Sequence, residues 1–267
     1  MGMMLRTLRI SNMKMMKNNL LYYDFGSSDI TAFTTTRHGG CSVGDYASMN
    51  VNTYCGDDAE HIAENRRRLC ALLGIESENL VFPHQVHGTA VREVFRGGIS
   101  PDCLECDAVT TDVRGLCIGV STADCVPVLV HDSVHHAVAA IHAGWRGTVK
   151  RIVARTLDFM HSRYGTFAAD CRAVIGPCIG VDAFEVGDEV YEAFAAEGFS
   201  MDAIAVRYDK YHIDLVECNR LQLTEMGLLS ENIQLSGVCT FTQYSDFFSA
   251  RRLSIHSGRL LTGIMMK

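Results

Sequence analysis

Apolar and polar positions along the chain predict helices and strands in a mixed order. One helix is expected from Asp57/Asp58 to Gly74, because Ile62 and Leu69 lie on one helix face, Asp caps helix N-termini and Gly ends helices. Three more helices are expected: 148–164, closed by Gly165; 188–196; and one that begins with Asp214-Leu-Val-Glu217, a start similar to a capping box.

Short apolar runs between these helices predict strands at 80–82, 89–94, 116–120, 126–130 and 138–141. Strands and helices do not alternate strictly, which indicates an α+β fold. No internal repeat and no Pro/Gly/Ser-rich linker divides the chain. We therefore expect residues 20–267 to form a single domain around a large mixed β-sheet flanked by helices.

Residues 1–19 are expected to be an N-terminal extension outside this domain. Met13, Met15 and Met16 are alternative initiators, which suggests a misassigned start. The segment has no apolar core of the length that a signal peptide needs, and no stretch of the chain reaches the roughly 20 apolar residues of a membrane span. The 11 cysteines among 267 residues are odd in number and too sparse for a disulfide framework. We expect a cytoplasmic protein with no membrane partner.

Composition and charge are those of an ordinary globular protein. Hydrophobic residues make up 48% of the chain and charged residues 21%, and the formal net charge is -7. No lysine-rich run is present, which argues against nucleic acid as a partner. The sequence leaves the oligomeric state open.

Candidate chemistry is concentrated in three short motifs: His84-Gln-Val-His87-Gly88, Ala123-Asp124-Cys125-Val126-Pro127 and His142-Ala-Gly-Trp145-Arg146-Gly147. One thiolate and two imidazoles, from Cys125, His87 and His142, suit Zn²⁺ or copper, and three protein ligands leave a fourth position open. Only the fold can bring these three residues together. The alternative is that each His is an ordinary surface or core residue and Cys125 is a small buried apolar one.

Taken together, the motifs resemble the YfiH/YlmD family, whose members are labelled multicopper polyphenol oxidase laccase-domain proteins. Further segments on both sides of the three motifs match the family in its order: Thr35-Thr36-Arg37-His38-Gly39-Gly40-Cys41-Ser42 and Tyr46-Ala47-Ser48-Met49-Asn50 before them, and Gly176-Pro177-Cys178-Ile179-Gly180, Ala183-Phe184-Glu185-Val186-Gly187, and Phe247-Phe248-Ser249 with Arg251-Arg252 after them. The resemblance implies the family's α+β fold, metal ligands at His87, Cys125 and His142, and purine nucleoside phosphorylase and adenosine deaminase activity.

Phosphorolysis of a nucleoside requires a phosphate site, and arginine binds phosphate with a planar, bidentate fork. Arg37 and Arg146 lie near glycines in matched motifs, so we expect both to be catalytic together with Cys125. Asn50, Gln85 and Arg251 are expected to bind substrate. The alternatives are that these arginines form surface ion pairs and that the amides are turn residues. Asp107 or Asp124 could orient a ligand imidazole.

The function expected is a metal-dependent purine nucleoside phosphorylase that acts on adenosine, inosine and methylthioadenosine, with Zn²⁺ or Cu²⁺ as cofactor and with adenosine deaminase activity. A copper-dependent polyphenol oxidase is the first alternative. Multicopper oxidases use about ten histidines, mostly as His-x-His pairs, whereas this chain has 11 histidines and no His-x-His. A metal-free cysteine hydrolase with Cys125 as nucleophile and His142 as base is the second alternative.

Overall fold

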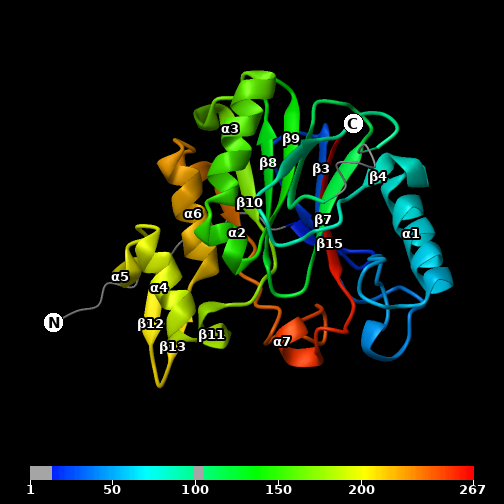
Figure 1. The fold of residues 1–267 in the computed structure, drawn as a ribbon. Coiled ribbons are helices and arrows are strands. Elements are labelled where there is room, and N and C mark those ends of the chain that lie inside the picture. The colour runs from blue at the N-terminus through cyan, green and yellow to red at the C-terminus, as the bar shows by residue number, and fades with distance from the viewer. Residues whose placement is uncertain (1–13, 99–104) are drawn as a thin grey trace.

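Two six-stranded mixed β-sheets packed face to face form the centre of the computed structural model, which describes residues 14–98 and 105–267 (Figure 1). In the first sheet the order is β1-β2-β3-β15-β7-β4, and in the second it is β14-β10-β8-β9-β6-β5. A small antiparallel sheet, β11-β13-β12, lies apart from both.

The strands have these bounds: β1 Lys14–Lys17, β2 Leu20–Tyr23, β3 Ile30–Thr35, β4 Leu80–Val81, β5 Val91–Glu93, β6 Ala108–Thr111, β7 Cys117–Thr122, β8 Val126–Asp132, β9 Ala137–Ala143, β10 Cys171–Ile175, β11 Glu185–Val186, β12 Ala205–Arg207, β13 Tyr211–Ile213, β14 Ile233–Leu235 and β15 Leu260–Met266. The helices are α1 Ala59–Leu73, α2 Trp145–Val149, α3 Ile152–Tyr164, α4 Asp188–Ala196, α5 Met201–Ile204, α6 Leu215–Glu225 and α7 Ala250–Leu253.

Alternating side chains of the strands build one core between the sheets and one on each outer face. In β9, Val138 and Ala140 pack between the sheets, whereas Ala139 and Ile141 pack against the helices on the outer face of the second sheet. Helices α2, α3 and α6 cover that face, α4 packs beside the small sheet, and α1 covers the outer face of the first sheet (Figure 1). Strands covered on both faces read as continuous apolar runs, which is how β8 and β9 appear in the sequence.

The α+β class and its mixed sheets are confirmed, as are the five predicted strands and three of the four predicted helices. Asp58 caps α1 by accepting the backbone N–H of Glu60 and of His61, and α1 ends at Gly74, whose φ is +68°. The strands form two large sheets rather than one. The first sheet is joined by β15 at the end of the chain, which pairs with both β3 and β7.

The prediction of one helix over 148–164 was wrong, because the chain forms α2 and α3 with a break at Arg151. That residue has a left-handed φ of +61°. Its guanidinium donates to Glu225 at 2.9 Å and lies 3.8 Å from the centre of the Phe199 ring, and these contacts hold the break in place.

The N-terminal extension overlaps the first sheet. Residues 14–17, expected to lie outside the fold, form β1, which pairs antiparallel with β2. Residues 1–13 of the extension lie outside the described residues. Across residues 14–98 and 105–267, none of the helices combines the length and the apolar character needed to cross a bilayer.

Candidate functional site

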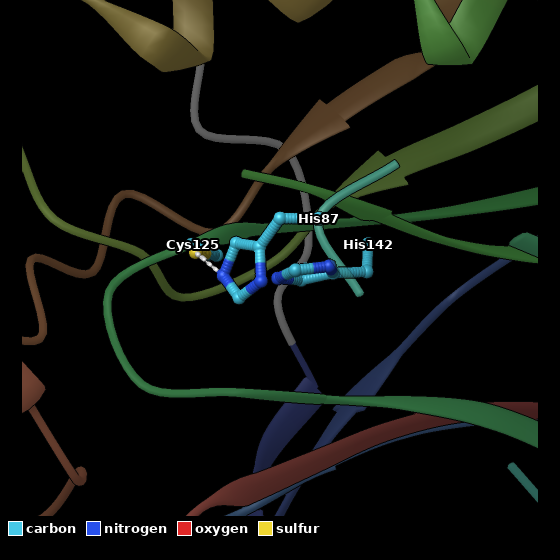
Figure 2. A group of neighbouring side chains, drawn as sticks. All are labelled: His87, Cys125 and His142. Carbon is cyan, nitrogen blue, oxygen red and sulfur yellow. Dashed lines mark hydrogen bonds between the residues drawn. The ribbon is translucent and has the colours of Figure 1, made fainter. Parts of the chain in front are cut away.

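The three residues expected to bind metal meet at one end of the central sheets. His87 lies in the loop between β4 and β5, Cys125 directly precedes β8, and His142 is the last but one residue of β9. Since β8 and β9 are antiparallel, the start of β8 and the end of β9 lie together. The ligand-type atoms of the three side chains are within 4.8 Å of one another (Figure 2), with 3.9 Å between Cys125 Sγ and His87 Nε2.

Asp107 holds two of these residues in place. Its Oδ1 accepts hydrogen bonds from His142 Nδ1 at 2.8 Å and from the backbone N–H of His87 at 2.9 Å. Its Oδ2 accepts the backbone N–H of Gly88 at 2.7 Å and of Val86 at 3.3 Å. Burial raises the pKa of Asp107, but His142 and these hydrogen bonds outweigh burial and hold the pKa below its usual range. With Nδ1 engaged, Nε2 is the atom that His142 offers to a metal.

Both loops that carry ligands contain a residue with a left-handed backbone, His87 with φ +58° and Asp124 with φ +87°. A non-glycine residue in this region costs roughly 1–2 kcal/mol. Asp107 holds the His87 loop. Asp124 holds its own loop, because its carboxylate accepts Thr240 Oγ1 at 2.7 Å and the backbone N–H of Arg251 at 2.6 Å. Asp107, and not Asp124, therefore orients a ligand imidazole.

Cys125 and His142 shift one another's ionisation in opposite directions. Burial raises the pKa of the Cys125 thiol, but His142 and His87 outweigh burial and lower that pKa to about 6. Burial also lowers the pKa of His142, but Cys125 and Asp107 outweigh it and raise that pKa to about 9. These shifts favour a thiolate paired with an imidazolium in the metal-free site, and a thiolate is the form of cysteine that binds metals or attacks as a nucleophile. Metal binding requires His142 to release its Nε2 proton.

The donors and the space around them fit a divalent cation such as Zn²⁺ or Cu²⁺. One thiolate and two imidazoles match the ligand number of catalytic zinc sites. A Cβ on Gly144 would lie 3.0 Å from His87 Cδ2 and 3.3 Å from Cys125 Sγ, so glycine at this position keeps the space around the donors open. Elsewhere in the described part of the chain, no group of three or more His, Cys, Asp or Glu side chains has this spacing.

A cavity of about 840 Å³ contains the three residues in its lining. Its walls combine polar, aromatic and cationic side chains from loops of both sheets. The lining residues are Asn52, Tyr54, Cys55, His84, Gln85, His87, Ser121, Thr122, Ala123, Asp124, Cys125, His142, Ile179, Phe184, Ala250, Arg251, Ser254, Ile255 and Arg259. The volume falls in the range of about 300–1,000 Å³ typical of small-molecule sites.

Two of the predicted substrate-binding residues lie in this lining. Arg251 lies over the Phe184 ring, 5.5 Å from its centre, and donates to the carbonyl oxygen of Glu185 at 3.2 Å. Gln85 Nε2 donates to the carbonyl oxygen of Ser121, and Gln85 Oε1 accepts the backbone N–H of Ser121, each at 2.7 Å. Gln85 therefore joins the His87 loop to the end of β7, and its amide is already engaged.

Asn50, Arg37 and Arg146 lie outside the lining. Asn50 is fully buried, and its Oδ1 accepts the backbone N–H of Arg259 at 3.1 Å, so it supports the cavity wall from behind. Arg37 donates to the carbonyl oxygens of Ala47 and Tyr244, each at 2.9 Å. Arg146 is exposed on α2, with its guanidinium 4.3 Å from the centre of the Trp145 ring.

Sequence reasoning missed Arg259 and Tyr54, which both line the cavity. The Tyr54 ring stacks on His84, with 4.0 Å between ring centres and 21° between ring planes. Arg259 directly precedes β15, and the pairing of β15 with β7 brings it to the cavity. The motif His84-Gln-Val-His87 could have pointed to an aromatic partner, whereas the C-terminal position of Arg259 offers no such signal.

Comparison with known proteins identifies the family. The family model described as multi-copper polyphenol oxidoreductase laccase matches residues 31–267. The crystal structure of the Bacillus licheniformis hypothetical protein YfiH superimposes with a TM-score of 0.89 at 30% sequence identity, covering 96% of this chain and 99% of that one. The chain belongs to the YfiH/YlmD family. The resemblance read from the motifs is thereby confirmed.

Similar proteins carry two enzyme names. A purine nucleoside phosphorylase from Bacteroides thetaiotaomicron is 47% identical over 249 residues, which cover 90% of this chain and 92% of that protein. The adenosine deaminase RL5, from an unknown prokaryotic organism, is 42% identical over 257 residues, which cover 91% and 97%. The names given to these YfiH/YlmD relatives describe chemistry on nucleosides, whereas the family model's description names phenol oxidation.

Proposed function

We propose that this chain is a metal-dependent purine nucleoside phosphorylase that cleaves adenosine, inosine and methylthioadenosine with phosphate and also deaminates adenosine, with residues 20–267 acting as one domain. The observation that carries the proposal is the convergence of His87, Cys125 and His142 in a nucleoside-sized cavity that two arginines also line. The phosphorylase at 47% identity and the deaminase at 42% identity support both activities.

His87, Cys125 and His142 would hold a Zn²⁺ or Cu²⁺ ion, and such an ion supplies a Lewis acid that polarises an oxygen of the substrate. Asp107 fixes the His142 ring through the 2.8 Å hydrogen bond to Nδ1 and sets the tautomer that offers Nε2. Gly144 leaves the room that a ligand needs beside the three donors.

The stacked Tyr54 and His84 rings are suited to the purine base. Tyr54 is 55% exposed, so one ring face remains open in the cavity lining. Aromatic rings pack on one another in offset-stacked or edge-to-face arrangements worth about 0.5–1.5 kcal/mol beyond their burial. We place the base against Tyr54 and the sugar nearer the three donors.

Phosphate dependence distinguishes this proposal from simple hydrolysis. Purified enzyme incubated with inosine and phosphate is expected to release hypoxanthine and ribose 1-phosphate in equal amounts, whereas the same enzyme without phosphate releases little of either. Chromatography of base and sugar products measures both. Equal base release with and without phosphate would indicate a hydrolase, and no base release from any purine nucleoside by fully metal-loaded enzyme would disprove the proposal.

Phenol oxidation is the second candidate, because the family model is described as a polyphenol oxidoreductase and the donors also suit copper. Zinc has no redox chemistry. We therefore expect zinc-loaded, copper-free enzyme to cleave inosine and to leave a phenol such as syringaldazine unoxidised, with oxidation appearing only after copper loading. Absorbance assays on the two metal forms measure this. Strong phenol oxidation by the zinc form would contradict the assignment.

A further inference from the structure

The cavity has an excess of positive charge from side chains that are not metal ligands. Two guanidinium groups, of Arg251 and Arg259, belong to its lining, and Asp124 is its one carboxylate among the described residues. The Asp124 carboxylate is already bound to Thr240 and to the backbone N–H of Arg251. A cleft with unneutralised positive charge attracts an anion.

The two arginines differ in the donors that they leave open. Arg251 directs both Nη1 and Nη2 to the carbonyl oxygen of Glu185, at 3.2 and 3.3 Å. This occupies the outer end of its guanidinium. Arg251 therefore adds positive charge to the cavity, but its two terminal nitrogens are shared with the backbone.

Arg259 keeps a complete bidentate edge. Its Nη1 donates to the carbonyl oxygens of Ser257 and Gly258, and its Nη2 donates to that of Ile255 at 2.7 Å. These bonds fix the guanidinium plane. Among the described residues Nε makes no hydrogen bond and Nη2 makes one, so Nε and the second N–H of Nη2 are the donors that can form a fork on two oxygens of a phosphate.

The backbone of Arg259 is held from two sides. Leu260, the next residue, pairs with Thr122 of β7, and Asn50 accepts the Arg259 backbone N–H at 3.1 Å. A guanidinium fixed in this way loses little conformational entropy when it binds an anion.

Two buried hydroxyl groups of the cavity lining are unpaired at the same strand end. Ser121 is 5% exposed and Thr122 is 1% exposed, and neither hydroxyl oxygen has a hydrogen-bond partner within the described residues. Buried polar groups in native proteins are almost always paired, so an unpaired hydroxyl in a cavity lining indicates a missing water or ligand. Ser121 and Thr122 are consecutive in β7, so their side chains point to opposite faces of the sheet. Thr122 shares the face of Ile118 and Val120, which is turned toward the second sheet that carries His142, and an oxyanion would supply the acceptor that its hydroxyl lacks.

We infer that Arg259 and Thr122 form an oxyanion subsite that binds inorganic phosphate as the second substrate. The inference rests on the proposed function and replaces Arg37 and Arg146, which lie outside the cavity lining, as the phosphate-binding residues. Nε and Nη2 of Arg259 donate to two phosphate oxygens, and the Thr122 hydroxyl donates to a third.

The subsite prepares phosphate for attack on the sugar. One phosphate oxygen forms a bond to C1′ of the ribose while the bond from C1′ to the base nitrogen breaks. The electron pair of that bond leaves with the base, which takes up the proton that hydrogen phosphate loses. Holding the attacking group in place can supply about 7–11 kcal/mol of barrier lowering when its geometry is right.

Direct binding of inorganic phosphate to metal-loaded protein tests the inference. In isothermal titration calorimetry, Arg259→Gln is expected to weaken phosphate binding about 10- to 100-fold, and Thr122→Val about 3- to 10-fold, from the lost hydrogen bonds. Arg259→Lys keeps the charge without the fork, so its affinity should lie between wild type and Arg259→Gln. Arg252→Gln is the matched control: it removes a neighbouring exposed arginine outside the cavity lining and should bind phosphate as wild type does.

Activity assays add a second measurement. Arg259→Gln should raise the KM for phosphate in proportion to its lost affinity while leaving the KM for inosine and the bound metal unchanged. Because Arg259 also holds three carbonyl groups of its own loop, thermal unfolding is measured for every variant. If Arg259→Gln does not fold, Arg259→Lys and Thr122→Val provide the test.

Three results would overturn the inference. The first is unchanged phosphate affinity in folded Arg259→Gln. The second is a loss of phosphate affinity in Arg37→Gln or Arg146→Gln instead. In the third, Arg259→Gln loses affinity for inosine 5′-monophosphate but keeps it for inorganic phosphate, which would assign Arg259 to a nucleotide. Arg259-dependent phosphate binding in a wild-type protein that releases no base would support the subsite and contradict the phosphorylase.

Discussion

Cys125→Ala is expected to lose the bound metal and about 100-fold or more of the nucleoside-cleaving activity, because the thiolate is the anionic donor among the three ligands. His142 and His87 lower the pKa of the wild-type thiol to about 6, which favours the thiolate, and metal binding then releases the proton that His142 holds. Elemental analysis of protein purified without added metal, together with the inosine assay, measures both effects.

Cys55→Ala is the matched control for this variant. Cys55 also lines the cavity and is also free, but it does not belong to the three-residue cluster. Its replacement should leave the bound metal unchanged. Full metal retention in Cys125→Ala would show that Cys125 is not a metal ligand.

The same variant separates the metal enzyme from a metal-free cysteine hydrolase. A thiolate beside an imidazolium is also the arrangement of a cysteine nucleophile, and the geometry of Cys125 and His142 suits both roles. Chelation of the metal from wild-type protein distinguishes them. Loss of activity on chelation, with recovery on adding zinc, supports the metal enzyme; full activity after chelation combined with loss in Cys125→Ala supports the hydrolase.

The sequence predicted those parts of the fold that are set by residues close together in the chain, such as the ends of helices. The Asp58 cap and Gly74 set the ends of α1, and Asp214 sets the start of α6 by accepting the backbone N–H of Glu217. The break at Arg151 could not be predicted, because the contacts that hold it come from Glu225 and Phe199, which are distant in the chain. The division of the strands into two sheets likewise depends on β15, a C-terminal segment for which no strand was predicted.

The candidate site shows the same division between local and distant causes. His87, Cys125 and His142 were found because their residue types suit a metal and their motifs match the family. Nearby glycines predicted Arg37 and Arg146, but this local property does not say which way a side chain faces. Arg146 consequently lies exposed on α2, whereas Arg259, found only through strand pairing, lines the cavity.

Asp107→Asn is expected to weaken metal binding about 10- to 100-fold, as losses of groups that orient metal ligands typically do. The carboxylate accepts four hydrogen bonds, two on each oxygen, from His142 and from three consecutive backbone N–H groups. An amide of the same shape has only one accepting oxygen, and its NH₂ group faces donors. The His142 ring and the His87 loop therefore both lose their anchor, and the unpaired groups should lower the free energy of unfolding by about 1–3 kcal/mol.

Asp132→Asn separates lost metal binding from lost stability. Asp132 is also fully buried, and it accepts His135 Nδ1 at 2.8 Å and the backbone N–H groups of Val134 and His135, but it lies at the opposite end of β8, away from the cavity. Its replacement should lower the free energy of unfolding by a similar amount and leave zinc affinity unchanged. Competition with a chromophoric chelator measures the affinity, and urea unfolding measures the stability. Equal zinc affinity in the two variants would show that Asp107 supports the fold alone and does not position the ligands.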